Sequence, residues 1–153
     1  MKICFVTEEF AGLNRSGGIG ACVAGLARLY AQDGHNVSVL VTDLSCDLRR
    51  YPTSKNNISF HYLADASFDD VSRTDGGSKE KSYLVFCFLK KHKYDVVHFH
   101  EYLGLGHYAC MARRQGLLDS IVVTHTHGSH VWTRRYNLQS PTIDILEFEG
   151  MER

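Results

Sequence analysis

Short apolar runs alternate along the chain with segments in which apolar residues recur every three or four positions. The runs predict strands, and they lie at residues 2–7, 36–42, 58–62, 94–99 and 120–124. The periodic segments predict helices, and they lie at residues 19–30, 78–92, 103–116 and from 142 onward. Strands and helices in this alternation favour a doubly wound, mostly parallel α/β sheet of the Rossmann-like class.

The first strand, helix and strand form a βαβ unit, which imposes parallel strands and a right-handed crossover. Gly34 suits the left-handed turn that ends the first helix, and Ser78 is the predicted N-cap of the second. Residues 43–57 lack periodicity and are predicted to be loop, whereas residues 58–62 alternate as a half-exposed strand does. Residues 120–124 are predicted to be a core strand.

The composition is that of one globular domain with no strong charge preference. The chain has 153 residues, 44% of them hydrophobic, with 17 basic and 17 acidic side chains. A balanced net charge gives no overall field toward nucleic acid or anionic lipid, so a bound anion needs a local site.

The cysteines and the apolar runs indicate the cellular compartment of the protein. The five cysteines are scattered and odd in number, which argues against a disulfide framework and a cysteine zinc site. No run approaches the roughly 20 apolar residues that span a bilayer, and the first strand begins at Lys2, which leaves no room for a signal peptide. The sequence therefore predicts a cytoplasmic protein, with peripheral membrane contact left open.

Ligands of open parallel sheets gather where loops leave the carboxyl ends of the strands. The first such loop contains Arg15, Gly17 and Gly18 at the start of the first helix. Glycines there let a ligand approach free N–H groups that favour phosphate, and the arginine adds a charge. The same residues also suit a flexible turn. A dinucleotide fingerprint is incomplete, because Val23 stands where a third glycine belongs.

The second loop follows the strand at residues 94–99. His98 and His100 share one face of that strand by its period of two, and Phe99 faces the other way. The strand end is expected to present His100, Glu101 and a phenol toward a cleft. For His98, we expect a core histidine that is bonded to backbone.

The third loop follows the strand at residues 120–124. It contains His125, His127 and His130, with Gly128 among them. Three histidines within six residues suggest a site, although a turn with incidental histidines gives the same pattern.

These segments, in this order, resemble motifs of retaining GT-B glycosyltransferases of the GT4 family and of the related glycogen and starch synthases. The resemblance lies in a basic-x-Gly-Gly-x-Gly loop, a Gly-His-x-Val phrase, a strand ending His-x-His-acidic and a strand ending in His-Gly. The matching segments are residues 15–20, 34–37, 95–101 and 122–128. Arg15 replaces the lysine of the synthases, and Glu101 replaces an aspartate.

The resemblance implies that residues 1–153 are the N-terminal, acceptor-side domain of a longer two-domain chain. The second Rossmann-like domain of the family holds the nucleotide sugar, and its Glu-x₇-Glu motif is absent here. The implied activity is transfer of a sugar from a nucleotide-sugar donor to an acceptor hydroxyl, with retention. The acceptor is a carbohydrate, a lipid-linked molecule or a small molecule, and the isolated chain is expected to be inactive.

The resemblance also implies site residues. His127 matches the family's active-site histidine, near the donor sugar and the scissile bond. The implied substrate-binding residues are Arg15, Gly17, Gly18, His100, Glu101 and Gly128. With no metal motif in the sequence, we expect no metal or other cofactor, and the departing diphosphate is met by cations and backbone N–H groups.

Other functions remain alternatives. A metal-dependent hydrolase would use His125, His127 and His130, with His98 and His100 as further ligands. That pattern requires more ligands downstream, yet no histidine follows His130. A nucleotide-binding module of the NAD type would use Asp43 on a ribose, and a non-enzymatic interaction domain is the last alternative.

Overall fold

The computed structural model confirms the doubly wound α/β class. It describes residues 1–14, 16–45, 52–65, 77–101, 103–128 and 130–151. The strands are β1 (Lys2–Thr7), β2 (Asn36–Val41), β3 (Ser54–Lys55), β4 (Ile58–Tyr62), β5 (Val96–Glu101) and β6 (Ile121–Thr126). The helices are α1 (Gly18–Gln32), α2 (Ser78–His92), α3 (His107–Arg114), α4 (His130–Tyr136) and α5 (Ile143–Met151).

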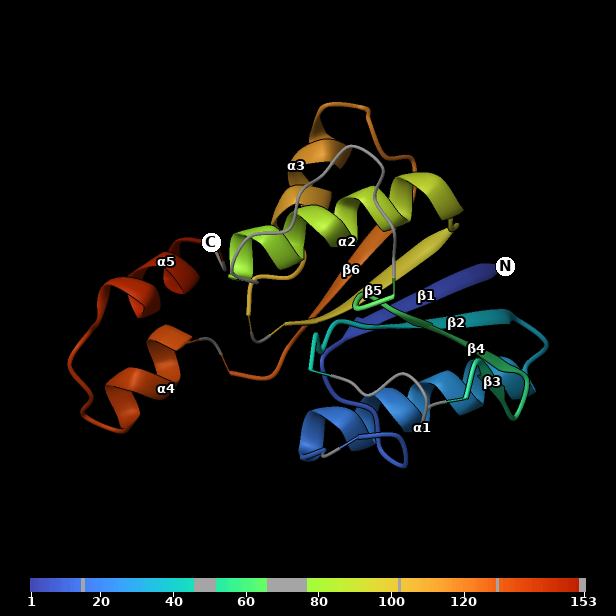
Figure 1. The fold of residues 1–153 in the computed structure, drawn as a ribbon, viewed down its shortest axis with the longest axis horizontal. Coiled ribbons are helices and arrows are strands. Elements are labelled where there is room, and N and C mark those ends of the chain that lie inside the picture. The colour runs from blue at the N-terminus through green and yellow to red at the C-terminus, as the bar shows by residue number, and fades with distance from the viewer. Residues whose placement is uncertain (15, 46–51, 66–76, 102, 129, 152–153) are drawn as a thin grey trace.

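Within the described residues the strands form one sheet in the order β3-β4-β2-β1-β5-β6. Neighbouring strands are parallel except for the short β3, which is antiparallel to β4. Helix α1 covers one face of the sheet, and α2 and α3 cover the other (Figure 1). Helices return the chain to the same end of the sheet between β1 and β2, between β4 and β5, and between β5 and β6.

Two cores fill the space between the sheet and these helices. Neighbouring residues of β1 point to opposite faces, so Phe5 packs under α1 while Val6 packs under α2 and α3. Phe99 of β5 lies in the second core, and both phenylalanines are fully buried. Burying side chains of this size stabilises the fold by about 1.5–3 kcal/mol each.

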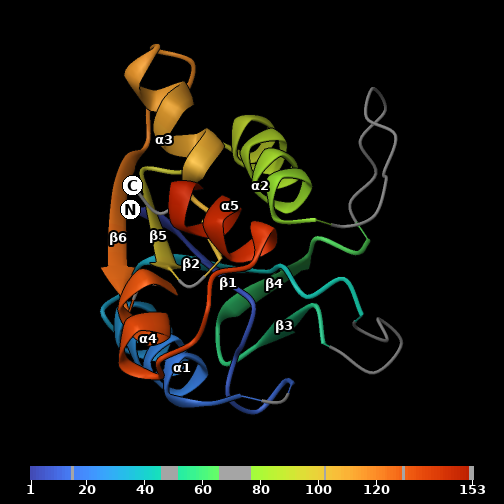
Figure 2. The ribbon, with the colours of Figure 1, turned by 90° about the vertical axis from the view of Figure 1, so that its left-hand side faces the viewer.

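Helices α4 and α5 lie off the end of the sheet at which the parallel strands finish (Figures 1 and 2). Arg134 Nε of α4 donates a hydrogen bond to Glu149 Oε1 of α5 over 2.7 Å. An ion pair between Lys79 and Glu147 joins α5 to the start of α2. The last turn of α5 also packs tightly against the loop after β5, where a Cβ on Gly104 would approach that of Met151 to 2.6 Å.

Strands β5 and β6 differ from their predictions because both end two residues later. The continuation places His100 and Glu101 in β5 and His125 in β6, where loops were expected. The prediction of a core strand at residues 120–124 is also wrong, since β6 is an edge strand whose residues are half-buried or exposed. Valine-rich runs of this length look alike in core and edge positions.

Other helix and strand boundaries also differ from the predictions. Strand β3 lies inside the predicted loop, and α4 was not predicted. Helix α3 begins at His107 rather than at residue 103. The N-cap of α2 is Gly77 and makes no side-chain capping bond, so the prediction of Ser78 as the cap is wrong.

Candidate functional site

The strand order locates the site. Strands β1 and β5 are neighbours, but the chain runs from β1 to β2 on one side and reaches β5 on the other only later. This reversal is the topological switch point, where open α/β sheets bind ligands outside the carboxyl ends of the strands. A small, open pocket lies there. It is lined by Thr7, Glu8, Glu9, Ile19, His100, Leu103 and Leu105.

Two carboxylates that the sequence analysis did not single out follow β1 into this pocket. Glu8 Oε1 accepts a hydrogen bond from the ammonium of Lys81 on α2 over 2.7 Å. Glu9 Oε2 accepts one from the backbone N–H of Gly17 over 2.7 Å. The Glu8 carboxylate is therefore held from α2, and the Glu9 carboxylate is held from the loop before α1. In the sequence, the signal for both residues was their position directly after a buried strand.

The glycine-rich loop borders the pocket through Ile19. Gly18 is exposed at the first position of α1, and a Cβ built there meets nothing within 4 Å. The N–H of Gly17 is already bonded to Glu9, so a phosphate at that group would have to replace the carboxylate. The assignment of Gly17 and Gly18 to substrate binding stays a prediction, and that of Arg15 falls outside the described residues.

Gly20 was not assigned a role from the sequence, yet its backbone has close neighbours. A Cβ there would lie 2.5 Å from Ser16 Cβ and 3.1 Å from Glu9 Cβ. Contacts under 3.0 Å between such atoms force a shift, so Gly20 permits α1 to approach the loop after β1.

Gly18 and Gly20 give a testable contrast. We expect Gly20→Ala to lower the free energy of unfolding by up to about 2 kcal/mol, because a steric cost of about 1–3 kcal/mol opposes a gain in helix propensity of about 1 kcal/mol. Gly18→Ala should leave that free energy unchanged or slightly raised, since its Cβ enters open space. Urea unfolding of the two variants measures both. Equal stabilities would contradict the packing role of Gly20.

A layer of four imidazoles lies beside the pocket, contributed by the ends of β5 and β6. Among its nitrogens, His98 Nδ1 lies 2.9 Å from His125 Nε2, and His100 Nδ1 lies 2.9 Å from His127 Nε2. The rings of His100 and His125 stack with centroids 4.5 Å apart and planes 5° apart. The predicted shared face of His98 and His100 is thus confirmed, and each contacts the histidine two positions beyond its direct partner in β6.

Burial sets the protonation of His98 and His100. His100 is only 2% exposed, and burial together with the charges of His125, His127 and His98 lowers its pKa to about 3. Burial, followed by the charge of His125, also lowers the pKa of His98. Both rings are neutral at pH 7. His98 is a core histidine as expected, but its partner is an imidazole rather than backbone.

His127 differs from His100 in its exposure. It follows β6, is exposed to solvent, and is tied to the buried ring of His100. Gly128 follows with a φ of 107°, a left-handed value that disfavours other residues. The backbone of Glu101 pairs with Thr126 in β6, whereas its side chain, like that of His130, is outside the description.

The site bears on two of the alternative functions, the metal-dependent hydrolase and the NAD-type module. His125 contacts His98 and His127 contacts His100, an arrangement that does not unite the loop histidines in one ligand set. The Asp43 carboxylate accepts hydrogen bonds from the N–H and hydroxyl of Ser45, so it is engaged in a local turn rather than free for a ribose. Neither alternative is favoured by these contacts.

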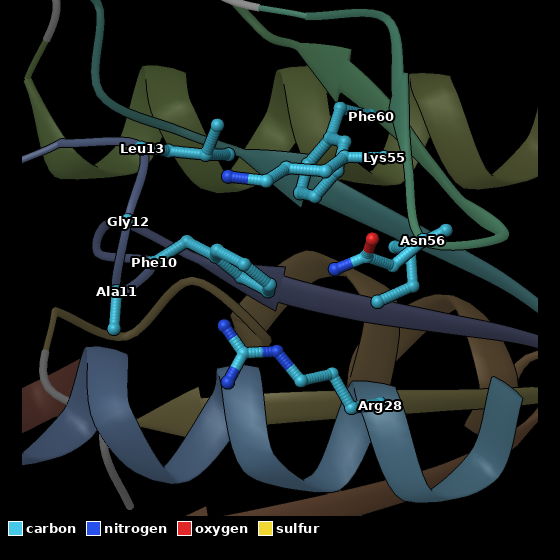
Figure 3. A pocket seen from close by; sticks show the side chains of 9 residues that line it. Phe10, Ala11, Gly12, Leu13, Arg28, Lys55, Asn56 and Phe60 are labelled. Atoms are coloured by element: carbon cyan, nitrogen blue, oxygen red, sulfur yellow. The ribbon is translucent and has the colours of Figure 1, made fainter. Parts of the chain in front are cut away.

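A second, shallow hollow lies between α1 and the β3–β4 turn. Figure 3 shows the guanidinium of Arg28 directed toward Phe10, with Lys55 and Asn56 on the opposite wall. Phe10 and Phe60 meet edge to face at 5.1 Å. None of the site residues predicted from the sequence lines this hollow.

A family model for Glycosyltransferase Family 4 matches residues 16–148. The chain belongs to glycosyltransferase family 4. The matched region includes Gly17 and Gly18 of the glycine-rich loop, though not Arg15, and the carboxyl ends of both β5 and β6, so the predicted resemblance is confirmed. Within the described part of the chain, no helix has the length and apolar character needed to cross a membrane.

Two proteins illustrate the relationship. A glycogen synthase from Hydrogenobaculum sp. (strain Y04AAS1) is 26% identical over 136 residues, covering 67% of this chain and 28% of that protein. The catalytic domain of starch synthase IV from Arabidopsis thaliana, bound to ADP and acarbose, shares the fold with a TM-score of 0.57 and 16% identity. That match covers 86% of this chain and 34% of the other. The chain thus spans about a third of the length of these relatives.

Proposed function

We propose that this chain is the N-terminal, acceptor-side half of a GT-B glycosyltransferase. The parent enzyme transfers a sugar from a nucleotide-sugar donor to an acceptor hydroxyl with retention. The observation that supports this best is the pocket at the switch point, which the buried His100 lines and beside which the exposed His127 is held. The ADP bound to the related starch synthase is consistent with a nucleotide-sugar donor.

The pocket chemistry suits an acceptor rich in hydroxyls. Carboxylates accept hydrogen bonds from hydroxyl groups, and Glu8 and Glu9 both line the pocket. We assign this space to a carbohydrate, a lipid-linked acceptor or a small-molecule acceptor, with Glu101 at its border. Peripheral contact with a membrane is compatible with a lipid-linked acceptor.

The leaving group requires positive charge. A departing nucleoside diphosphate is stabilised by backbone N–H groups at a helix N-terminus and by cationic side chains. Gly18 at the start of α1 and Arg15 before it supply these groups in our proposal, and His127 with Gly128 lies near the donor sugar. The reaction therefore needs no metal cofactor. We also propose the cytoplasm as its location, because Cys4, Cys22, Cys87 and Cys110 are free thiols.

The division of labour between two domains gives a direct test. We expect residues 1–153 alone to transfer no sugar and to bind UDP-, ADP- or GDP-sugars only weakly, with dissociation constants in the millimolar range. Phosphate contacts at an exposed loop are screened by salt and solvent until a second domain closes over them. Calorimetry measures the affinity, and joining the chain to a donor-binding domain should strengthen it.

Arg15→Ala extends this test. In the two-domain enzyme we expect it to weaken donor use while the free energy of unfolding stays unchanged, because an arginine in a polar, glycine-containing loop is not expected to support a core. Micromolar binding of a nucleotide sugar by residues 1–153 alone would overturn the proposed division, since the donor site would then lie in this domain.

A further inference from the structure

Three potential metal ligands from different segments meet beside the pocket. Cys22 belongs to α1, His100 ends β5, and His127 follows β6. One ligating atom from each side chain can be chosen so that all three lie within 4.8 Å of one another. Cys22 and His100 are 78 residues apart in the sequence, and His100 and His127 are 27 residues apart. Spacing along the chain therefore does not predict this cluster.

His100 gives a second, independent indication of a ligand. Its Nδ1 contacts His127, but its Nε2 is buried and has no hydrogen-bond partner among the described residues. Buried polar nitrogens are almost always paired, so an unpaired one calls for an explanation. Because the two ring nitrogens of an imidazole point in divergent directions, Nε2 faces away from His127, so His100 offers a nitrogen that no described protein group occupies.

We propose that Cys22, His100 and His127 together bind one soft transition-metal ion, with zinc as the best fit. A thiolate and two imidazoles form a ligand set that suits zinc, and three protein ligands leave a fourth tetrahedral position for water. Tetrahedral bonds of about 2.0–2.3 Å place ligand atoms about 3.3–3.8 Å apart. Atoms that lie up to 4.8 Å apart must therefore approach one another by up to about 1.5 Å. Rotation of the exposed side chains of Cys22 and His127 can provide this.

Metal binding has a chemical consequence for the proposed enzyme. On coordination the Cys22 thiol releases its proton to solvent, and one nitrogen of His127 becomes a metal ligand. If the proposed function holds, zinc therefore inhibits glycosyl transfer, because it removes the imidazole that lies near the donor sugar. This is opposite to a metal-dependent hydrolase, which would gain activity from the same ion. The binding itself does not depend on the proposed function.

The test begins with the 153-residue chain and metal alone. We expect one zinc per chain by elemental analysis after dialysis, and a cobalt complex with a near-ultraviolet thiolate-to-metal absorption band. Cys22→Ser should abolish that band and weaken zinc binding at least about 100-fold, since changes even outside the first ligand shell cost 10–100-fold. His127→Ala should weaken zinc binding similarly.

Matched variants separate this site from general thiol or imidazole binding. Cys110→Ser changes another exposed cysteine, on α3, and His107→Ala changes a histidine at the start of the same helix. Both should bind zinc as the wild type does. Zinc should also protect Cys22, but not Cys110, from alkylation, as peptide mass spectrometry can show. Absence of stoichiometric zinc, or zinc binding that Cys22→Ser leaves intact, would overturn the proposal.

A last measurement distinguishes this inference from the proposed function. In an active two-domain enzyme, micromolar zinc should inhibit the wild type and a chelator should restore its activity. Cys22→Ser should keep the uninhibited activity and become at least about 10-fold less sensitive to zinc. Zinc binding without any glycosyl transfer would refute the function and leave the site standing, whereas transfer that is insensitive to bound zinc would refute the inhibition.

Discussion

We expect His127→Ala to lower kcat/KM for glycosyl transfer about 100-fold in the two-domain enzyme, which corresponds to about 2.7 kcal/mol of transition-state stabilisation. The imidazole is exposed beside the pocket and held by the buried ring of His100. In the proposed mechanism it stabilises charge that develops on the sugar, an effect that would disappear with the side chain. The free energy of unfolding should stay near that of the wild type, because removing an exposed side chain leaves no cavity in the core.

Steady-state kinetics with a nucleotide sugar, combined with urea unfolding, separates these effects. His107→Ala is the control, since this histidine lies at the start of α3 and does not line the pocket. That variant should retain wild-type kcat/KM. Wild-type turnover by His127→Ala would exclude His127 from the mechanism, whatever the control shows.

The central fold follows from the sequence because local pattern and tertiary position agree there. Residues 2–7 form β1 as predicted, and the stripe at residues 19–30 lies within α1. The alternation at residues 58–62 gives β4 with alternate buried side chains. The φ of 81° at Gly34 is the left-handed turn expected after the first helix. In these segments a periodic apolar face meets a core, so period alone identifies the element.

The pattern is less informative at the edges of the sheet. Nothing within residues 121–124 distinguishes an edge strand from a central one, because that depends on whether another strand pairs with β6. Strand β3 is two exposed residues long and is defined by its pairing with β4, a tertiary contact. Exposed side chains on α4, such as Trp132 and Tyr136, also obscure the apolar stripe by which helices are recognised.

The site was predictable by segment but not by contact. Sequence reasoning singled out the two segments that contain His100 and His127. Their pairing depends on the register of β5 against β6, in which His100 lies opposite His125 and contacts His127 diagonally. Cys22 belongs to a helix on one face of the sheet, and its approach to both histidines follows from the packing of α1. Contacts of this kind depend on strand register and helix packing, so spacing along the sequence does not predict them.

The largest effect on stability is expected at the floor of this site. Phe5 in β1 is fully buried, and its ring stacks on that of His98 with centroids 4.9 Å apart. The rings of Tyr30 and His100 lie at 5.9 and 6.0 Å from it. Phe5→Ala should therefore lower the free energy of unfolding by about 3–5 kcal/mol, the usual cost of removing a buried aromatic ring and leaving a cavity.

Chemical unfolding in urea measures this change, with Ile121→Ala as the control. Ile121 is 53% exposed on the edge strand β6, so its truncation should change stability by no more than about 0.5 kcal/mol. A loss below about 1 kcal/mol for Phe5→Ala would show that the core under α1 does not depend on this ring.

Phe5→Leu distinguishes the effect on stability from the effect on the site. Leucine refills much of the cavity, so the domain should stay folded, with a loss of about 1 kcal/mol. It cannot reproduce the flat surface against which His98 stacks, and through His125 and His100 that surface supports the ring of His127. We therefore expect kcat/KM of the folded Phe5→Leu enzyme to fall several-fold. Unchanged kinetics would show that the β5–β6 pairing alone orients the imidazoles.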